Sequence, residues 1–237
     1  MNTRHPKYLL AGGRGKSILS TFDIVRNILQ LTGKTKPVVA YIGAASLNDN
    51  WLFYIIVSIL IRTRCNCRIE RVAISTPKAD LEKARIILKK ADAIFFSGGD
   101  VESGMQILKE KDMVGFFRDL VNGDQLFFGI SAGSILMSRE WVRWEDPRND
   151  STAEIFPCLG LVPLICDTHA EKDDWVELKT ALKLEKPGTT GYGLTSGSCL
   201  KVFSDGKIEV EAGVVAMFIY INGQLERQAD LVPIPRK

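Results

Sequence analysis

The sequence predicts a three-layer α/β fold in which a mostly parallel sheet is flanked by helices. Short apolar runs alternate with helical patterns through the first 140 residues, an order typical of parallel sheets with helices on both faces. Two of these runs, Ala93–Phe96 and Leu126–Ile130, lack apolar–polar alternation, as expected for buried parallel strands. In the last third, short strand-like runs with turn signals predict an antiparallel extension beside this sheet.

The expected elements follow one another without a repeat, a linker or a clear boundary, so we expect one domain over residues 1–237. The expected strands of the parallel sheet are Tyr8–Ala11, Val38–Ile42, Arg71–Ile74, Ala93–Phe96 and Leu126–Ile130. The expected helices are Ser17–Leu31, Trp51–Arg62, Lys78–Lys90, Glu102–Lys109, Val114–Val121 and Ala132–Arg139. The apolar run Trp51–Ile61 is too short to cross a bilayer and is typical of a buried core helix.

The last third of the chain changes pattern. We expect a strand in the apolar run Leu159–Ile165 and a helix over Trp175–Leu184. The further expected strands are Gly193–Val202, Lys207–Val210 and Ala216–Ile221. The turn signals Ser204-Asp205-Gly206 and Asn222-Gly223 favour hairpins between such strands.

The composition excludes several function classes. Hydrophobic residues make up 46% and charged residues 25% of the chain, close to the average of globular domains. A net charge of +3 is too small to indicate a nucleic-acid or membrane partner. No signal peptide is recognisable, and the five cysteines form an odd count. We therefore expect reduced thiols in a cytoplasmic protein.

The clearest chemical signal is Gly129-Ile130-Ser131-Ala132-Gly133. A buried strand runs directly into the serine and a helix begins after it, which is the context that a G-x-S-x-G nucleophile elbow requires. Such a turn projects the hydroxyl above the sheet edge, and the N–H that follows the serine points at the developing oxyanion. The start of the helix adds favourable positive potential. The motif predicts a serine hydrolase with Ser131 as its nucleophile.

A serine nucleophile needs a base, usually a histidine, and the chain contains two. His5 lies in a polar N-terminal tail that we expect to fray. His169 follows the apolar run ending at Ile165, on a loop past a strand end, where catalytic groups collect in open α/β sheets. By elimination, a Ser–His mechanism would use His169. So few histidines, with no thiols at metal-binding spacing, predict neither a metal nor a cofactor.

A second oxyanion donor is expected from Ser97-Gly98-Gly99-Asp100, where another buried strand runs into two glycines. Glycines let backbone N–H groups approach a ligand closely. The N–H of Gly99 or Asp100 would then complement the N–H of Ala132.

The segments S-G-G-D, G-I-S-A-G and D-T-H, each after an expected strand, resemble the dipeptidase E and cyanophycinase family of serine peptidases over about residues 8 to 203. The resemblance implies a flavodoxin-like fold related to class I glutamine amidotransferases, whose elbow carries cysteine. It also implies a metal-free enzyme that cleaves small acidic peptides or isoaspartyl linkages. The implied roles are nucleophile for Ser131, base for His169, and oxyanion hole for the backbone of Gly99 and Ala132. Asp167, two residues before the histidine, matches the cyanophycinase side of the family.

The orienting carboxylate is missing from the segment Gly193–Gly197, where the family often carries one. In dipeptidase E-like chains another candidate lies about fifteen residues after the nucleophile, and Asp146 occupies that position here. We expect Asp146 to orient His169; the alternatives are Asp167 and no carboxylate at all. An orienting carboxylate matters because its loss lowers the rate about 10⁴-fold in a chymotrypsin-type triad.

The sequence therefore predicts a serine exo- or dipeptidase whose partner is a small peptide, which the resemblance extends to acidic peptides. Recognition of an acidic group favours a nearby arginine. The stretch after His169 offers one lysine and three acids, so Arg139 and Arg143 are the remaining candidates. The sequence does not decide between a monomer and a homodimer.

Three other functions remain open. The loop Gly12–Ser17 ends like a phosphate loop, but Leu10 stands where that motif requires its first glycine. A catalytically weakened or inactive family member would bind a small ligand in the same cleft. An esterase of the α/β-hydrolase type would share the elbow, but the chain has no H-G-G-G-like loop and no histidine near its C-terminus.

Overall fold

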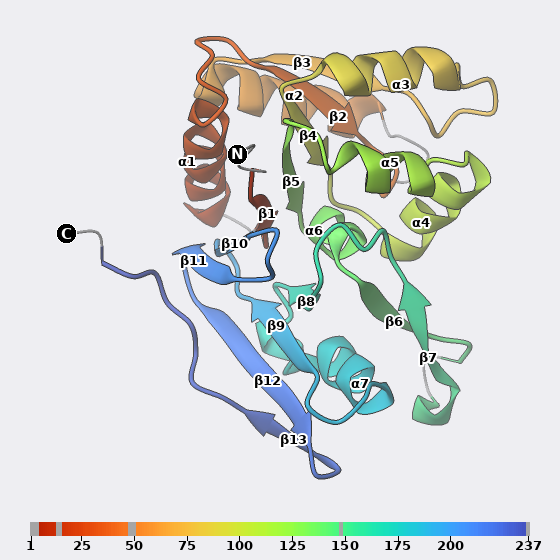
Figure 1. Ribbon diagram of the computed structural model, residues 1–237, viewed down its shortest axis with the longest axis vertical. Coiled ribbons are helices and arrows are strands. Elements are labelled where there is room, and N and C mark those ends of the chain that lie inside the picture. Colours follow the sequence, from red (N-terminus) through yellow and green to blue (C-terminus); the bar gives the residue numbers. More distant parts are fainter. Residues whose placement is uncertain (1–4, 13–15, 47–50, 147–148, 236–237) are drawn as a thin grey trace.

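A seven-stranded sheet forms the middle layer of the protein in a computed structural model, which describes residues 5–12, 16–46, 51–146 and 149–235 (Figure 1). Its strands, in spatial order, are β11 (Ile208–Ala212), β10 (Cys199–Val202), β1 (Lys7–Leu10), β5 (Leu126–Ile130), β4 (Ala93–Phe96), β2 (Val38–Ile42) and β3 (Arg68–Val72). Neighbours from β1 to β3 are parallel, whereas β10 and β11 are antiparallel at one edge. The predicted mostly parallel sheet with antiparallel C-terminal strands is confirmed.

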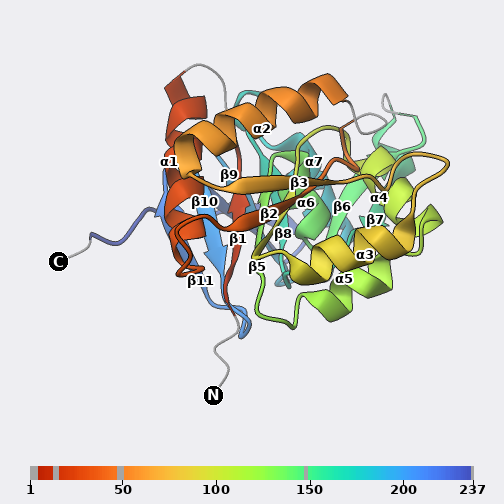
Figure 2. The same cartoon turned by 90° about the horizontal axis from the view of Figure 1, so that it is seen from above.

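Helices cover both faces of this sheet (Figure 2). The helices are α1 (Lys16–Gln30), α2 (Trp51–Cys65), α3 (Leu81–Lys90), α4 (Val101–Glu110), α5 (Val114–Leu120), α6 (Ala132–Met137) and α7 (Val176–Leu184). Helices α1 and α2 pack on the face that carries Tyr41, Phe95 and Phe128, and α3 to α6 pack on the face that carries Phe96 and Phe127. Consecutive residues of β4 and β5 thus enter opposite cores, which is why these strands show no polar alternation.

A second sheet with the order β13-β12-β9-β8 lies below the central sheet in Figure 1. Its strands are β8 (Ile165–Thr168), β9 (Thr190–Leu194), β12 (Val215–Ile221) and β13 (Gln224–Arg227). Strands β8 and β9 are parallel, and the others are antiparallel. Helix α7 packs on this sheet through Trp175, Leu178 and Leu182, and this packing fixes the end of β8 that carries His169.

Several predicted boundaries were wrong for local reasons. The strand expected at Arg71–Ile74 is β3, whose register with β2 begins at Arg68. The helix expected from Lys78 begins at Leu81, because the Asp80 side chain caps it by accepting the Lys83 N–H at 2.9 Å. Helix α6 ends at Met137, two residues earlier than expected, and an extended residue follows it.

The expected strand Gly193–Val202 is two strands in different sheets. Strand β9 ends at Leu194, and a turn closed by the Ser198 N–H donating to Thr195 O at 2.9 Å leads to β10. Gly197 adopts φ +84° in this turn, a conformation that glycine tolerates best. The apolar run expected as a strand over Leu159–Ile165 is mostly a buried loop, and β8 begins at its last residue.

A hairpin of β6 (Glu140–Trp144) and β7 (Ala153–Pro157) follows the elbow helix and was not predicted. The expectation of a buried core helix for α2 was also wrong in part. Trp51, Leu52, Ile56 and Ile59 are exposed there. No helix in the described part of the chain has the length and apolar character needed to span a membrane.

The close crossing of α6 over β4 predicts opposite effects of adding one methyl group at two helical glycines. A Cβ on Gly133 would lie 2.0 Å from the carbonyl oxygen of Phe96, whereas a Cβ on Gly115 in α5 meets nothing within 4 Å. We expect Gly133→Ala to lower the free energy of unfolding by about 3 kcal/mol or more. Gly115→Ala should raise it by up to about 1 kcal/mol. Urea unfolding of both variants tests this, and equal effects would contradict the crossing.

Candidate active site

Ser131 occupies a strained turn between β5 and α6. Its backbone has φ +55° and ψ −127°, a conformation that residues other than glycine keep only where their surroundings enforce it. The Ser131 N–H donates to Leu10 O at 2.9 Å and extends the pairing of β1 with β5 by one residue. The half-buried side chain therefore emerges at the carboxyl ends of the parallel strands, where open α/β sheets bind their ligands.

Two glycines and a second serine allow this turn to pack tightly. A Cβ on Gly129 would lie 2.5 Å from the backbone of Gly133, which itself touches Phe96. The buried Ser134 hydroxyl accepts the Leu10 N–H at 2.9 Å and lies 2.8 Å from the carbonyl oxygen of Gly129. The first turn of α6 is thus held against β1, β4 and β5.

His169 follows β8 directly and reaches the serine. Its Nε2 lies 2.7 Å from Ser131 Oγ, a hydrogen-bond distance suited to proton transfer. The His169 backbone has φ +46°, and its N–H donates to Leu194 O at 2.8 Å. The structure therefore brings together the two side chains that the sequence predicted as nucleophile and base.

The sequence predicted two backbone N–H groups as oxyanion donors, and the structure shows the local backbone of each. The Ala132 N–H is the first of α6, so no helical hydrogen bond uses it. Gly99 has φ +146° and lies so close to Ala45 that a Cβ would be 1.8 Å from the Ala45 carbonyl oxygen. The Asp100 N–H already donates to that oxygen at 2.7 Å, which leaves Gly99 as the better candidate of the two.

The ring of His169 has no hydrogen bond or ion pair with a carboxylate among the described residues. Asp146, which we predicted to orient this ring, lies in the turn between β6 and β7. Its backbone N–H donates there to the Thr152 hydroxyl at 3.1 Å. Among the described residues, no hydrogen bond or ion pair joins the side chains of Asp146 and His169.

Two other acids interact electrostatically with His169, and sequence reasoning missed both. Partial burial acts to raise the pKa of the Glu171 carboxyl. Hydrogen bonds to its own backbone and to Ser196, with attraction to His169, instead hold that pKa below its usual range. Burial and nearby Asp173 raise the pKa of Glu177, while His169 acts in the opposite direction. The Ser196 N–H donates to Glu171 at 3.2 Å, so the segment that lacks the family's acid binds one from another loop.

Asp167, the alternative orienting residue, is buried against the start of α7, with 2% of its surface exposed. The Thr168 N–H donates to its Oδ1 at 2.7 Å, and Oδ2 has no partner among the described residues. Burial raises the pKa of Asp167 to about 7, and the nearby Glu177 adds to this effect.

In the described residues, no group of three or more His, Cys, Asp or Glu side chains could hold a metal ion.

Ser131 and His169 open into a cavity of about 920 Å³, a size typical of small-molecule sites. Gly99, Ser97 and Gly12 also line it. Residues 13–15 of the phosphate-loop-like segment lie outside the described residues, so that alternative is untested. Apolar side chains of α1 and α2 form another part of the wall, and sequence reasoning missed them. The unbroken apolar run of α2 was the available signal.

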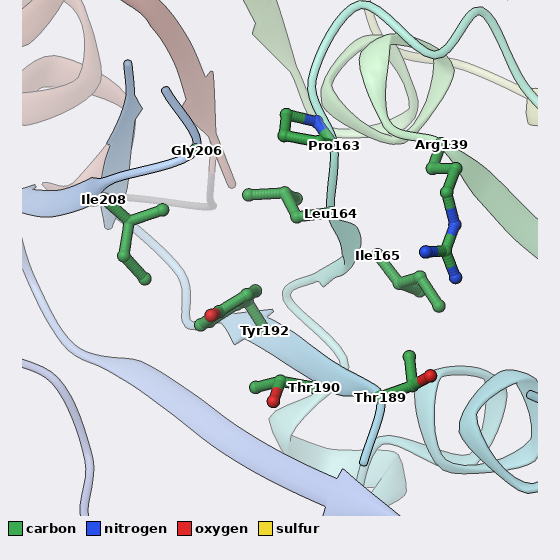
Figure 3. Close-up of a pocket in the computed structure, with 9 residues that line it drawn as sticks. All are labelled: Arg139, Pro163, Leu164, Ile165, Thr189, Thr190, Tyr192, Gly206 and Ile208. Carbon is green, nitrogen blue, oxygen red and sulfur yellow. The ribbon is translucent and has the colours of Figure 1, made fainter. Parts of the chain in front are cut away.

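Neither arginine considered for substrate recognition lines this cavity. Arg143 pairs with Glu102 and Glu154. Arg139 pairs with Glu140 and Glu185, and it lines a separate pocket of about 210 Å³ (Figure 3). That pocket is bordered by Pro163, Leu164, Ile165, Thr189, Thr190, Tyr192, Gly206 and Ile208, and none of the predicted site residues is among them.

The raised pKa of Asp167 predicts a pH-dependent stability that one substitution removes. The folded protein keeps the Asp167 proton up to about pH 7, whereas an unfolded aspartate loses it near pH 4. The folded state binds more protons between these values, so its stability falls as the pH rises. Relative to Asp167→Asn, the wild-type free energy of unfolding should fall by up to ~4 kcal/mol from pH 4 to pH 7.

Urea unfolding at a series of pH values measures this difference. Exposed Asp119→Asn serves as the control and should follow the wild-type profile. Parallel profiles for wild type and Asp167→Asn would show that the carboxyl ionises normally in the folded protein.

Comparison with known proteins supports the resemblance drawn from the motifs. The model of peptidase family S51 matches residues 8–210, which is most of the chain. A peptidase from an acI-B1 actinobacterium has a similar structure with a TM-score of 0.65 at 16% identity, over 98% of this chain and 95% of that chain. A Listeria monocytogenes EGD-e protein assigned as a peptidase E has a TM-score of 0.61 at 15% identity, over 87% and 98%.

The two solved structures are too distant in sequence to show more than the fold. A comparison with curated protein sequences finds no match. The family match covers the elbow, the glycine loop and the histidine together. The chain therefore belongs to peptidase family S51, as its resemblance to dipeptidase E and cyanophycinase implied.

Proposed function

We propose that the protein is a serine peptidase that hydrolyses short peptides through Ser131 and His169. The observation that carries this proposal is the 2.7 Å contact between Ser131 Oγ and His169 Nε2 at the edge of the cavity. Family membership supports hydrolysis of a peptide bond as the reaction. The serine mechanism and the small size of the substrate are inferences from the site.

In the proposed mechanism, Ser131 attacks the scissile carbonyl while His169 accepts the hydroxyl proton. The N–H groups of Gly99 and Ala132 stabilise the oxyanion, where preorganised donors have their largest effect. His169 then protonates the leaving amine. A water molecule, deprotonated by the same imidazole, releases the acyl group and restores the serine.

We infer that Glu171 is the carboxylate that supports the His169 imidazolium. It interacts favourably with His169 and is held by Ser196 at the rim of the cavity. The assignment of Asp146 to this role rests on its sequence position and remains a prediction. Because no carboxylate among the described residues is hydrogen-bonded to the ring, the support from Glu171 is electrostatic and weaker than that of a hydrogen-bonded triad member.

A second candidate function follows from the arrangement around His169. A family member whose histidine is not hydrogen-bonded to a carboxylate could be a weak hydrolase, or a module that binds a small ligand without cleaving it. Among the described residues the His169 ring is hydrogen-bonded to Ser131 and to no acid, which is the observation that favours this alternative. Measured turnover separates the two functions.

Removal of either member of the Ser131–His169 pair should abolish peptide hydrolysis. The test uses a dipeptide library that includes Asp-X and isoaspartyl members, with release of amine as the readout. We expect Ser131→Ala and His169→Gln to lower kcat/KM by at least about 10³-fold, as for residues that act as a unit. His5→Gln is the matched control and should retain wild-type activity.

Two other outcomes would contradict this proposal. Wild-type protein that binds dipeptides without cleaving any of them would favour the binding module. Cleavage of chromogenic esters without cleavage of peptides would favour an esterase.

Neutralising Glu171 and neutralising Asp146, the two acids considered as supports of His169, should have different effects on kcat/KM. We expect Glu171→Gln to lower kcat/KM about tenfold, which corresponds to ~1.4 kcal/mol of lost transition-state stabilisation. Asp146→Asn should leave kcat/KM within about threefold of wild type, because no contact joins it to His169. A large loss in Asp146→Asn alone would show that Asp146 reaches the histidine during turnover.

A further inference from the structure

We propose that the cavity beside Ser131 selects peptides with a bulky apolar residue next to the scissile bond, in place of the acidic residue that the family resemblance implies. This inference deepens the proposed function and depends on Ser131 being the site of cleavage. It rests on the apolar wall of the cavity and on the charges at its rim.

The wall is a continuous stripe on one face of α2. Phe53, Ile56, Val57 and Leu60 all line the cavity. Their spacing of i, i+3, i+4 and i+7 places them on one side of a helix. The residues of α2 that are buried against the sheet, Ser58, Ile61 and Cys65, are offset from this stripe. Helix α2 therefore has two apolar faces, one on the core and one on the cavity.

Other elements extend this apolar surface toward the nucleophile. Phe22 of α1, Phe95 of β4 and Ile130 of β5 line the same cavity, and Ile130 immediately precedes Ser131. Ile56 remains 49% exposed in the wall. Binding of an apolar side chain there would remove its own surface and that of the cavity wall from water. This favours binding in proportion to the area buried.

The charged groups at the rim disfavour an acidic substrate side chain. Among the described residues, the charged side chains that line the cavity are Glu171, Lys172 and Asp173. These two acids and one lysine carry a net negative charge, and none of the described lining residues is an arginine. On balance these described side chains would repel a substrate carboxylate, and they offer it no guanidinium for bidentate pairing. Its transfer to the apolar wall would also cost desolvation.

Binding to the cleavage-deficient Ser131→Ala protein tests selectivity apart from catalysis. Isothermal titration calorimetry would compare Phe-Ala and Ala-Phe with Asp-Ala and Ala-Asp, so that either side of the scissile bond is sampled. We expect the better Phe dipeptide to bind at least about tenfold more tightly than either Asp dipeptide, the low end of discrimination by an apolar pocket.

Two isoleucines of α2 provide a matched pair of variants. Ile56 lines the cavity and is 49% exposed, whereas Ile59 lies outside it and is 54% exposed. In the Ser131→Ala background, Ile56→Ala should weaken binding of the Phe dipeptide about tenfold. Ile59→Ala should not change it. Because both side chains are largely exposed, neither substitution removes a core contact.

Equal or tighter binding of an Asp dipeptide would overturn the inference. So would equal effects of the two isoleucine variants, or no binding of any dipeptide. Hydrolysis of the same dipeptides by wild-type protein tests the proposed function separately. Cleavage with a preference for Asp would refute the selectivity alone, whereas Phe-selective binding without cleavage would support the selectivity and refute the peptidase.

Discussion

The positive φ of Ser131 is the constraint on which the rest of the site depends. A side chain in this conformation costs of order 1–3 kcal/mol, so its surroundings must enforce it. They do so through backbone contacts that only glycine permits at Gly129 and Gly133, and through the buried Ser134 hydroxyl. The same contacts fix α6, whose first residue, Ala132, directly follows Ser131. The contacts that stabilise the fold at this turn are therefore the same ones that position the Ser131 side chain.

Sequence reasoning succeeded for those elements whose structure is determined by the local sequence alone. We predicted strands β4 and β5 correctly because their runs are apolar on both faces. We predicted the elbow between β5 and α6 correctly because only glycine permits such close backbone contacts. The β6–β7 hairpin was missed because neither strand is strongly apolar. The positions of the carboxylates around His169 depend on contacts between loops that are distant in the sequence. A local sequence pattern cannot predict such contacts.

The cavity combines the proposed catalytic pair with an apolar binding surface. Ser131 and His169 form the hydrogen-bonded pair, and Glu171 is held nearby by Ser196. One stripe of α2 and Phe22 of α1 line the same cavity. In the proposed binding mode, a substrate places its reacting carbonyl at the serine and its apolar side chain on the helix. The residues proposed to cleave would then differ from those proposed to select.

The proposed function requires that the elbow presents an activated serine. Labelling with a fluorophosphonate, followed by peptide mapping by mass spectrometry, tests this without any assumption about the substrate. We expect one adduct per folded chain, located at Ser131, with none after unfolding and none in His169→Gln. An unlabelled native protein, or labelling at Ser131 that is equally fast without His169, would contradict it.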